Sequence, residues 1–352
     1  MELVAERLGY GYSRHHSVKR FPADFRLPTS APSASLTAWP LIDTDSLDLP
    51  TTAAAKMKSV DLSASRLARL KPPYRLVVVD MDGTYLNSAG QISERNHKLA
   101  STLQQRGVHF VIATGRPSAV LQPLINEMGV ASLPTVTFNG ACLQHARANL
   151  PSTPLWYDAI EAAKAREVVA LCTEQLGLGI SYSTRATSYF VASTPEQREK
   201  LSTYERLEKV AQDHVLGSAA ELFAVDSLPL ALKIVALTPT PDAHAADARA
   251  ALSGRGIHVI SAEMHIEFVN EHVNKAAALR RLCDVLGVPL AGVVAFGDAM
   301  NDLEMLSSVG LGVAMKNARE AVKAVAAETC DFTNDEDGVA RRCEALIAQG
   351  LL

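Results

Sequence analysis

Residues 76–84 read Leu-Val-Val-Val-Asp-Met-Asp-Gly-Thr, and this stretch decides the fold. Its apolar half, rich in valine, predicts a short strand buried on both faces, as in a parallel sheet covered by helices. The strand ends at Asp80 and Asp82, two carboxylates that can point from one loop into one small volume. Like charges held together away from water need a cation or hydrogen bonds, and a hard divalent ion such as Mg²⁺ suits oxygen ligands. An ordinary Asp-Gly turn is the competing interpretation.

The sequence after this strand alternates between helix and strand patterns. Ser93 can cap a helix in which Leu99 and Leu103 share one face, and an apolar strand pattern follows at residues 109–113. Three further strand patterns each precede a loop rich in Gly, Asn or Asp, at residues 136–138, 293–296 and 311–314. This order predicts an α/β fold with a Rossmann-like, doubly wound parallel sheet. Ligands bind such sheets at the carboxyl ends of the strands, so these loops are the candidate sites.

Residues 152–262 have a different pattern, in which one helix precedes several short alternating strands. We interpret them as a separate α+β unit inserted into the first domain. The core is then expected to comprise residues 74–151 and 263–352. Residues 1–73 lack sustained periodicity and are expected to be a disordered leader. A transit segment, or sequence upstream of a start at Met57, is the alternative.

Two further stretches can bind anions. Thr114-Gly115-Arg116-Pro117 follows the strand pattern at residues 109–113, so the threonine hydroxyl and nearby amides can hold an anion. A plain helix cap explains the same residues. Lys275 follows Asn274 in the first turn of an expected helix, where a lysine opposes the helix dipole and calls for a nearby anion. A solvated lysine is the alternative there.

A second acidic loop, Gly297-Asp298-Ala299-Met300-Asn301-Asp302, also follows an apolar strand pattern. Acids at the first and fifth positions after the glycine can complete an oxygen-only metal site or brace its ligands. An acidic first turn that simply complements the helix dipole is the alternative.

Taken in order, these four motifs resemble those of the haloacid dehalogenase-like hydrolase superfamily. Three more stretches resemble its Cof-type branch, whose members carry a large α/β cap between the second and third motifs: residues 137–141, 312–318 and 334–339. The resemblance covers about residues 74–352.

The resemblance implies a phosphatase that works in two steps. Asp80 would attack phosphorus to give an aspartyl-phosphate, while Asp82 would protonate the leaving alkoxide and then activate water. This acid favours phosphate chemistry over dehalogenation, because expelling a halide needs no acid. The third catalytic group implied is Lys275.

The resemblance also implies the residues that hold the cofactor and the phosphate. Mg²⁺ would be held by Asp80, the backbone carbonyl of Asp82, and Asp298, while Asp302 and Thr84 would support the metal loops. The residues implied to bind phosphate oxygens are Thr114, Gly115, Asn301 and Lys275.

The resemblance implies that the substrate is a small phosphorylated metabolite, and a sugar phosphate is the first expectation. A phosphomutase or phosphotransferase acting on hexose phosphates, a flavin mononucleotide or nucleotide phosphatase, and a non-catalytic ligand sensor are the alternatives. We expect a monomer or a homodimer.

Composition restricts the partners and the location. The chain has 352 residues and a formal net charge of −4, which argues against an electrostatic nucleic-acid binder. No apolar run approaches the roughly 18 residues that a membrane span requires, and no secretory signal is visible. The five scattered cysteines suit a reducing compartment. We expect an intracellular protein, cytoplasmic in the first instance, with a plastid or mitochondrion as the alternative.

Overall fold

A computed structural model describes residues 73–208, 213–262 and 264–352. The predicted leader therefore lies outside the described residues, except for Pro73. None of the helices within the described ranges is long and apolar enough to cross a membrane.

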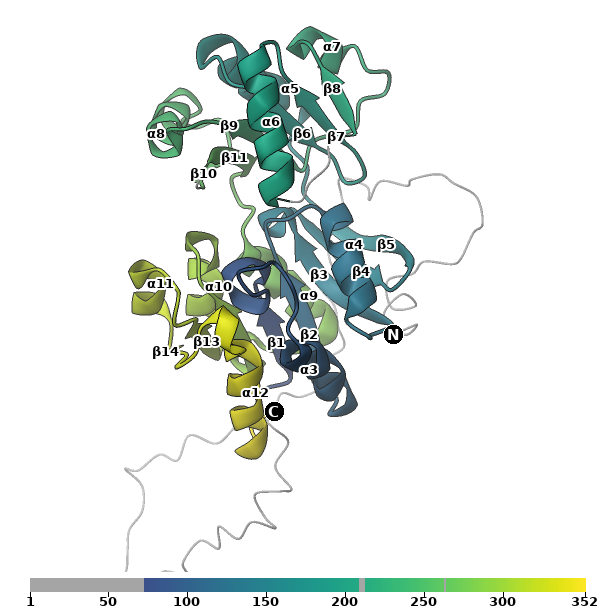
Figure 1. The fold of residues 1–352 in the computed structure, drawn as a ribbon, viewed down its shortest axis with the longest axis vertical. Coiled ribbons are helices and arrows are strands. Elements are labelled where there is room, and N and C mark those ends of the chain that lie inside the picture. The colour runs from purple at the N-terminus through teal and green to yellow at the C-terminus, as the bar shows by residue number, and fades with distance from the viewer. Residues whose placement is uncertain (1–72, 209–212, 263) are drawn as a thin grey trace, which may run out of the picture. The chain divides into compact units, whose positions relative to one another are not determined.

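The first sheet has eight strands in the order β14-β13-β12-β1-β2-β3-β4-β5 (Figure 1). The strands from β14 to β3 are parallel, whereas β4 and β5 form antiparallel pairs at one end. Their bounds are β1 Leu76–Val79, β2 His109–Ala113, β3 Ser132–Thr137, β4 Cys142–Arg147, β5 Leu150–Tyr157, β12 Val293–Gly297, β13 Leu311–Ala314 and β14 Glu328–Thr329. The central strand β1 is completely buried, as its apolar run predicts.

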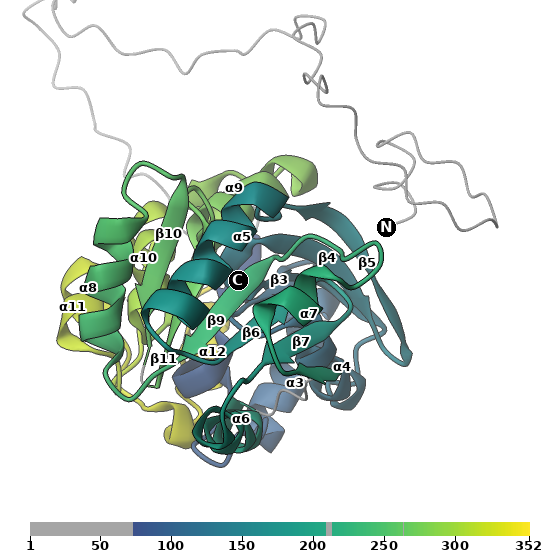
Figure 2. The same ribbon diagram turned by 90° about the horizontal axis from the view of Figure 1, so that it is seen from above.

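Helices cover both faces of this sheet. Crossovers between parallel strands are right-handed. The connecting helices therefore lie on one face where successive strands are added toward one end of the sheet, and on the other face where they are added toward the opposite end. Figure 2 shows α9 and α10 on one side of these strands and α3 and α4 on the other. The helices are α3 Glu94–Gln105, α4 Ser118–Glu127, α9 Lys275–Leu286, α10 Leu303–Ser308, α11 Glu320–Val325 and α12 Gly338–Ala348.

Two side chains cap helices of this part of the fold. The Ser93 side chain accepts a hydrogen bond from the backbone amide of Asn96, and the Asn274 side chain accepts one from the amide of Ala277. Pro117, whose backbone is extended, is the N-cap residue of α4.

A second sheet lies in residues 158–270, between β5 and α9. We call residues 158–270 the insert. Its strand order is β10-β11-β9-β6-β7-β8, and all pairs except β7–β8 are antiparallel. The strands are β6 Ile180–Ser183, β7 Ser188–Val191, β8 His214–Leu216, β9 Lys233–Leu237, β10 Ile257–Ser261 and β11 His265–Asn270. The helices are α5 Ala162–Ala170, α6 Pro195–Glu208, α7 Ala219–Phe223 and α8 Pro241–Ala251. The insert has an apolar core of its own.

Membership of the two sheets moves the predicted domain boundaries. Strand β5 extends past residue 151 and pairs with β4 in the first sheet, so the core runs further than expected. The prolines at positions 151 and 154 obscure this strand, since proline is tolerated only at a sheet edge. Strand β11 begins after residue 263 but pairs with β9 and β10 in the second sheet. Sheet pairing therefore places β5 with the first sheet and β11 with the second, a few residues beyond the expected junctions at 151/152 and 262/263.

Candidate active site

The site begins where two neighbouring parallel strands end. Strands β1 and β12 pair with Val79 opposite Phe296, so the loops that follow them leave the sheet side by side. The backbone amide of Asp80 donates to the carbonyl of Phe296 over 3.0 Å. Two acidic loops more than 200 residues apart in the sequence therefore share the carboxyl edge of the sheet.

Lys275 lies between two carboxylates. Its ammonium donates to Asp80 Oδ1 over 2.5 Å and to Asp302 Oδ1 over 2.7 Å, and its side chain is 0% exposed. Burial by itself would lower the pKa of Lys275, but the two carboxylates more than offset it and raise that pKa above its ordinary value. The unfavourable place of a lysine at a helix N-terminus is thus compensated by anions, which is the condition the sequence suggested.

Asp302 has both carboxylate oxygens engaged. Its Oδ1 accepts from Lys275, and its Oδ2 accepts the backbone amides of Asp298 and Ala299 over 3.0 and 3.1 Å. A carboxylate used in this way braces the loop and the lysine, and offers little to a ligand.

Asp298 is held from the opposite loop. The Thr84 hydroxyl donates to its Oδ1 over 2.8 Å. Gly83 has a φ of +73°, and a Cβ added there would lie 2.4 Å from Asp298 Oδ2, so only glycine allows this approach. The side-chain amide of Asn317 donates to the Gly83 carbonyl over 2.8 Å.

Three carboxylates form the acidic cluster of this site, Asp80, Asp298 and Asp302. One oxygen of each lies within 4.8 Å of an oxygen of the other two, although the oxygens of Asp302 are already engaged. Burial raises the pKa of Asp80 well above its ordinary value, against the lowering effect of Lys275 and with smaller raising effects of the neighbouring carboxylates. Burial, with a smaller contribution from Asp302, raises the pKa of Asp298 to about 6. Three acids share one ammonium, so an oxygen-seeking divalent cation fits this donor set and would relieve the excess negative charge.

Asp82 lies at the rim and not in the cluster. Its side chain is 54% exposed, and both of its oxygens accept from the nearly buried Arg116 guanidinium, over 2.7 Å to Nε and 2.5 Å to Nη2. Arg116 was not predicted as a partner of Asp82. Its position two residues after Thr114, in the loop that follows β2 beside β1, was the available signal. A carboxylate bound through both oxygens must leave this ion pair before it can deliver a proton to a leaving group.

Three of the residues expected to bind phosphate, Thr114, Gly115 and Asn301, lie around Asn139, which was not predicted as a site residue. The Thr114 hydroxyl oxygen accepts the backbone amide of Arg116 over 3.1 Å. The Asn301 side chain donates to Asn139 Oδ1 over 2.9 Å. A Cβ added at Gly115 would lie 2.9 Å from the same oxygen, so the glycine permits close contact.

The expected site residues therefore fall into three groups. One network contains Asp80, Asp298, Asp302, Lys275 and Thr84. Asp82 is paired with Arg116, and the phosphate-binding candidates Thr114, Gly115 and Asn301 lie around Asn139.

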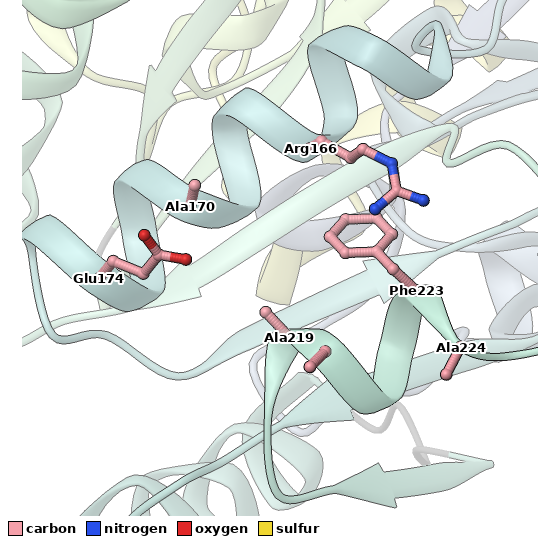
Figure 3. A pocket seen from close by; sticks show the side chains of 7 residues that line it. Arg166, Ala170, Glu174, Ala219, Phe223 and Ala224 are labelled. Atoms are coloured by element: carbon pink, nitrogen blue, oxygen red, sulfur yellow. The ribbon is translucent and has the colours of Figure 1, made fainter.

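A shallow groove of about 490 Å³ lies elsewhere, between α5 and α7 of the insert (Figure 3). The Arg166 guanidinium lies 4.0 Å from the centre of the Phe223 ring in this groove. None of the residues that line this groove belongs to the acidic cluster. The groove is therefore not part of the candidate active site.

Comparison with known proteins identifies the family. Residues 77–342 match the family model described as haloacid dehalogenase-like hydrolase. The chain belongs to the haloacid dehalogenase-like hydrolase family. The expected family and the expected α/β fold with a parallel-sheet core are thus confirmed.

Individual relatives of this hydrolase are phosphatases. It is 30% identical over 281 residues to the 5-amino-6-(5-phospho-D-ribitylamino)uracil phosphatase YitU of Bacillus subtilis, covering 76% of this chain and 96% of the relative. It is 29% identical over 279 residues to YcsE, another 5-amino-6-(5-phospho-D-ribitylamino)uracil phosphatase of Bacillus subtilis, covering 76% of this chain and 93% of the relative.

A solved structure described as a haloacid dehalogenase-like hydrolase from B. subtilis matches with a TM-score of 0.67 at 26% identity, over 77% of this chain and 99% of the other. The expectation of an enzyme of this family, related to phosphatases, is confirmed.

Proposed function

We propose that this protein is a Mg²⁺-dependent phosphatase that hydrolyses a small phosphate monoester of a sugar or sugar alcohol through an aspartyl-phosphate. The observation that carries this proposal is the position of Asp80, which lies at the end of β1 against the ammonium of Lys275. A carboxylate can approach a phosphate dianion only where positive charge offsets both anions.

The acidic cluster is the support for Mg²⁺ as the cofactor. Asp80, Asp298 and the backbone carbonyl of Asp82 would hold Mg²⁺, while Thr84 and Asp302 would keep the two loops in place. When bound, the ion would neutralise charge on the transferring phosphoryl group. Thr114, Gly115, Asn301 and Lys275 would bind its oxygens.

The first step forms a bond between a carboxylate oxygen of Asp80 and phosphorus, and the ester P–O bond breaks. The departing alkoxide takes a proton from Asp82, which must first leave its ion pair with Arg116 and be protonated. In the second step Asp82 takes a proton from water, and the water oxygen attacks phosphorus. The acyl-phosphate bond then breaks, which releases inorganic phosphate and regenerates Asp80.

The substrate class rests on the relatives and on the insert. The names of the YitU and YcsE phosphatases describe a phosphate carried on a ribityl group, a sugar alcohol. This class is close to the sugar phosphate expected from the sequence. The insert would act as a cap that excludes water during the first step and contacts the rest of the substrate.

The test compares wild-type protein with Asp80→Asn and with the matched control Asp226→Asn, which changes an exposed acid in the insert. Release of inorganic phosphate is measured from sugar phosphates, ribityl phosphates, flavin mononucleotide and nucleotides, with Mg²⁺ or with EDTA. We expect turnover in the wild type and the control, and its loss in Asp80→Asn. Unchanged turnover in Asp80→Asn would contradict the mechanism. Phosphate that passes to a hexose and not to water would indicate a phosphotransferase.

A further inference from the structure

A buried ion pair of the insert reaches into the phosphate-binding loops. Lys233 begins β9 and Glu267 lies in β11, and the Lys233 ammonium donates to Glu267 Oε1 over 2.6 Å. Their side chains are only 4% and 8% exposed. Burial alone would raise the pKa of Glu267, but Lys233 and His265 outweigh it and lower that pKa to about 2. Glu267 is therefore a carboxylate at neutral pH.

The lysine also holds one phosphate-binding loop. Its ammonium donates to the backbone carbonyl of Gly115 over 2.9 Å. This carbonyl belongs to the same peptide unit as the amide of Arg116, which donates to Thr114 Oγ1. Fixing that peptide unit fixes the direction of the amide and the position of the threonine oxygen. The hydroxyl, having accepted this bond, can turn its proton toward an anion.

The glutamate holds the other loop. Glu267 Oε2 accepts from Asn139 Nδ2 over 2.5 Å, and Asn139 Oδ1 accepts from Asn301 Nδ2 over 2.9 Å. The glutamate thus sets which way the Asn139 amide faces. With its nitrogen committed to the carboxylate, its oxygen is presented to Asn301.

Stability alone is a poor reason for this arrangement. Removing two charges from water costs several kcal/mol per ion, and apolar residues of similar size often serve stability as well. Each residue also contacts a loop more than 100 residues away in the sequence: Lys233 contacts Gly115, and Glu267 contacts Asn139. That division of contacts is what a positioning role requires.

We propose that Lys233 and Glu267 are positioning residues that set the geometry of phosphate binding by Thr114 and Asn301. The inference rests on the proposed function, since it assumes that these loops bind the phosphoryl group. It makes the insert a part of the phosphate site as well as a cover for it.

The principal test is the double variant Lys233→Met/Glu267→Met. Its matched control is Arg342→Met/Glu328→Met, which replaces a partly buried ion pair of the core outside the site. Inorganic phosphate, in the presence of MgCl₂, is the probe for calorimetric binding, and the unfolding midpoint, Mg²⁺ activation, KM and kcat are measured beside it.

We expect the Lys233→Met/Glu267→Met variant to stay folded and to keep its Mg²⁺ activation, because an apolar pair leaves no buried charge. Its affinity for phosphate should fall about tenfold or more, with a matching rise in KM, since two charge-assisted contacts to the loops are lost. The control should bind phosphate as the wild type does. A double variant that binds phosphate within twofold of the wild type would show that the pair is only structural and would overturn the inference.

Glu267→Gln gives a second test should the double variant not fold. A carboxylate accepts through two oxygens, whereas an amide accepts through one, so glutamine cannot serve both Lys233 and Asn139. Phosphate affinity should fall several-fold, and unchanged affinity would count against the inference. A wild type that neither binds phosphate nor releases it from an ester would overturn the proposed function as well. A wild type that does both, beside variants with unchanged binding, would overturn the inference alone.

Discussion

Replacing Lys275 with methionine should destabilise the protein strongly in the absence of metal. The substitution removes the ammonium that contacts Asp80 and Asp302 over 2.5 and 2.7 Å and leaves both carboxylates without this buried partner. Breaking a buried pair by removing one partner costs about 3–5 kcal/mol. For a folded unit of this size, that loss lowers the thermal midpoint by roughly 6–20 °C. MgCl₂ should restore part of the loss, because a divalent cation offsets the same carboxylates.

The measurement is thermal unfolding with EDTA and with MgCl₂, together with phosphatase turnover. Lys98→Met is the matched control, since it removes a lysine from an ion pair of similar length with Glu94 whose side chains are 71% and 85% exposed. Exposed pairs contribute about 0–1 kcal/mol, so this variant should unfold near the wild type and retain turnover. If Lys275→Met unfolds within about 1 kcal/mol of Lys98→Met under EDTA, the electrostatic account of the cluster is wrong.

Three further outcomes are expected. Gly83→Ala should lose most turnover and about 1–3 kcal/mol of stability, because a Cβ would meet Asp298 and alanine disfavours the positive φ; turnover and unfolding near wild-type values would argue against this packing. Thr84→Val should raise the Mg²⁺ concentration needed for half-maximal activity about tenfold, with kcat nearly kept at saturation, since a hydroxyl donor to Asp298 is lost; an unchanged requirement would exclude that role. The pKa of Glu267 in the folded protein is about 2, below its ordinary value of 4.5, so its contribution to stability is complete above about pH 4.5 and decreases as pH falls toward 2. Between pH 5 and pH 3, the free energy of unfolding in urea should therefore fall more steeply for the wild type than for Glu267→Gln. Equal slopes would contradict the lowered pKa.

Local features of the chain were predictable because their signals lie within a few residues. The apolar run of β1 requires a strand buried on both faces, and Ser93 and Asn274 cap helices through bonds to amides three residues ahead. The order of strands and helices then brings the ends of neighbouring strands to one edge of the sheet. Strand order therefore predicts that the loops of Asp80 and Asp298 lie at the same edge of the sheet.

The hydrolase family and its acidic loops were thus evident in the sequence of this protein, since strand periodicity and motif order are properties of the linear chain. Only the tertiary structure decided that Asp82 pairs with Arg116, that β5 and β11 move the domain junctions, and that Lys233 reaches the Gly115 carbonyl. These contacts join residues that are 34 and 118 positions apart, or depend on which strand a segment pairs with. No local pattern marks such partners, because packing selects them after the strands and helices have formed.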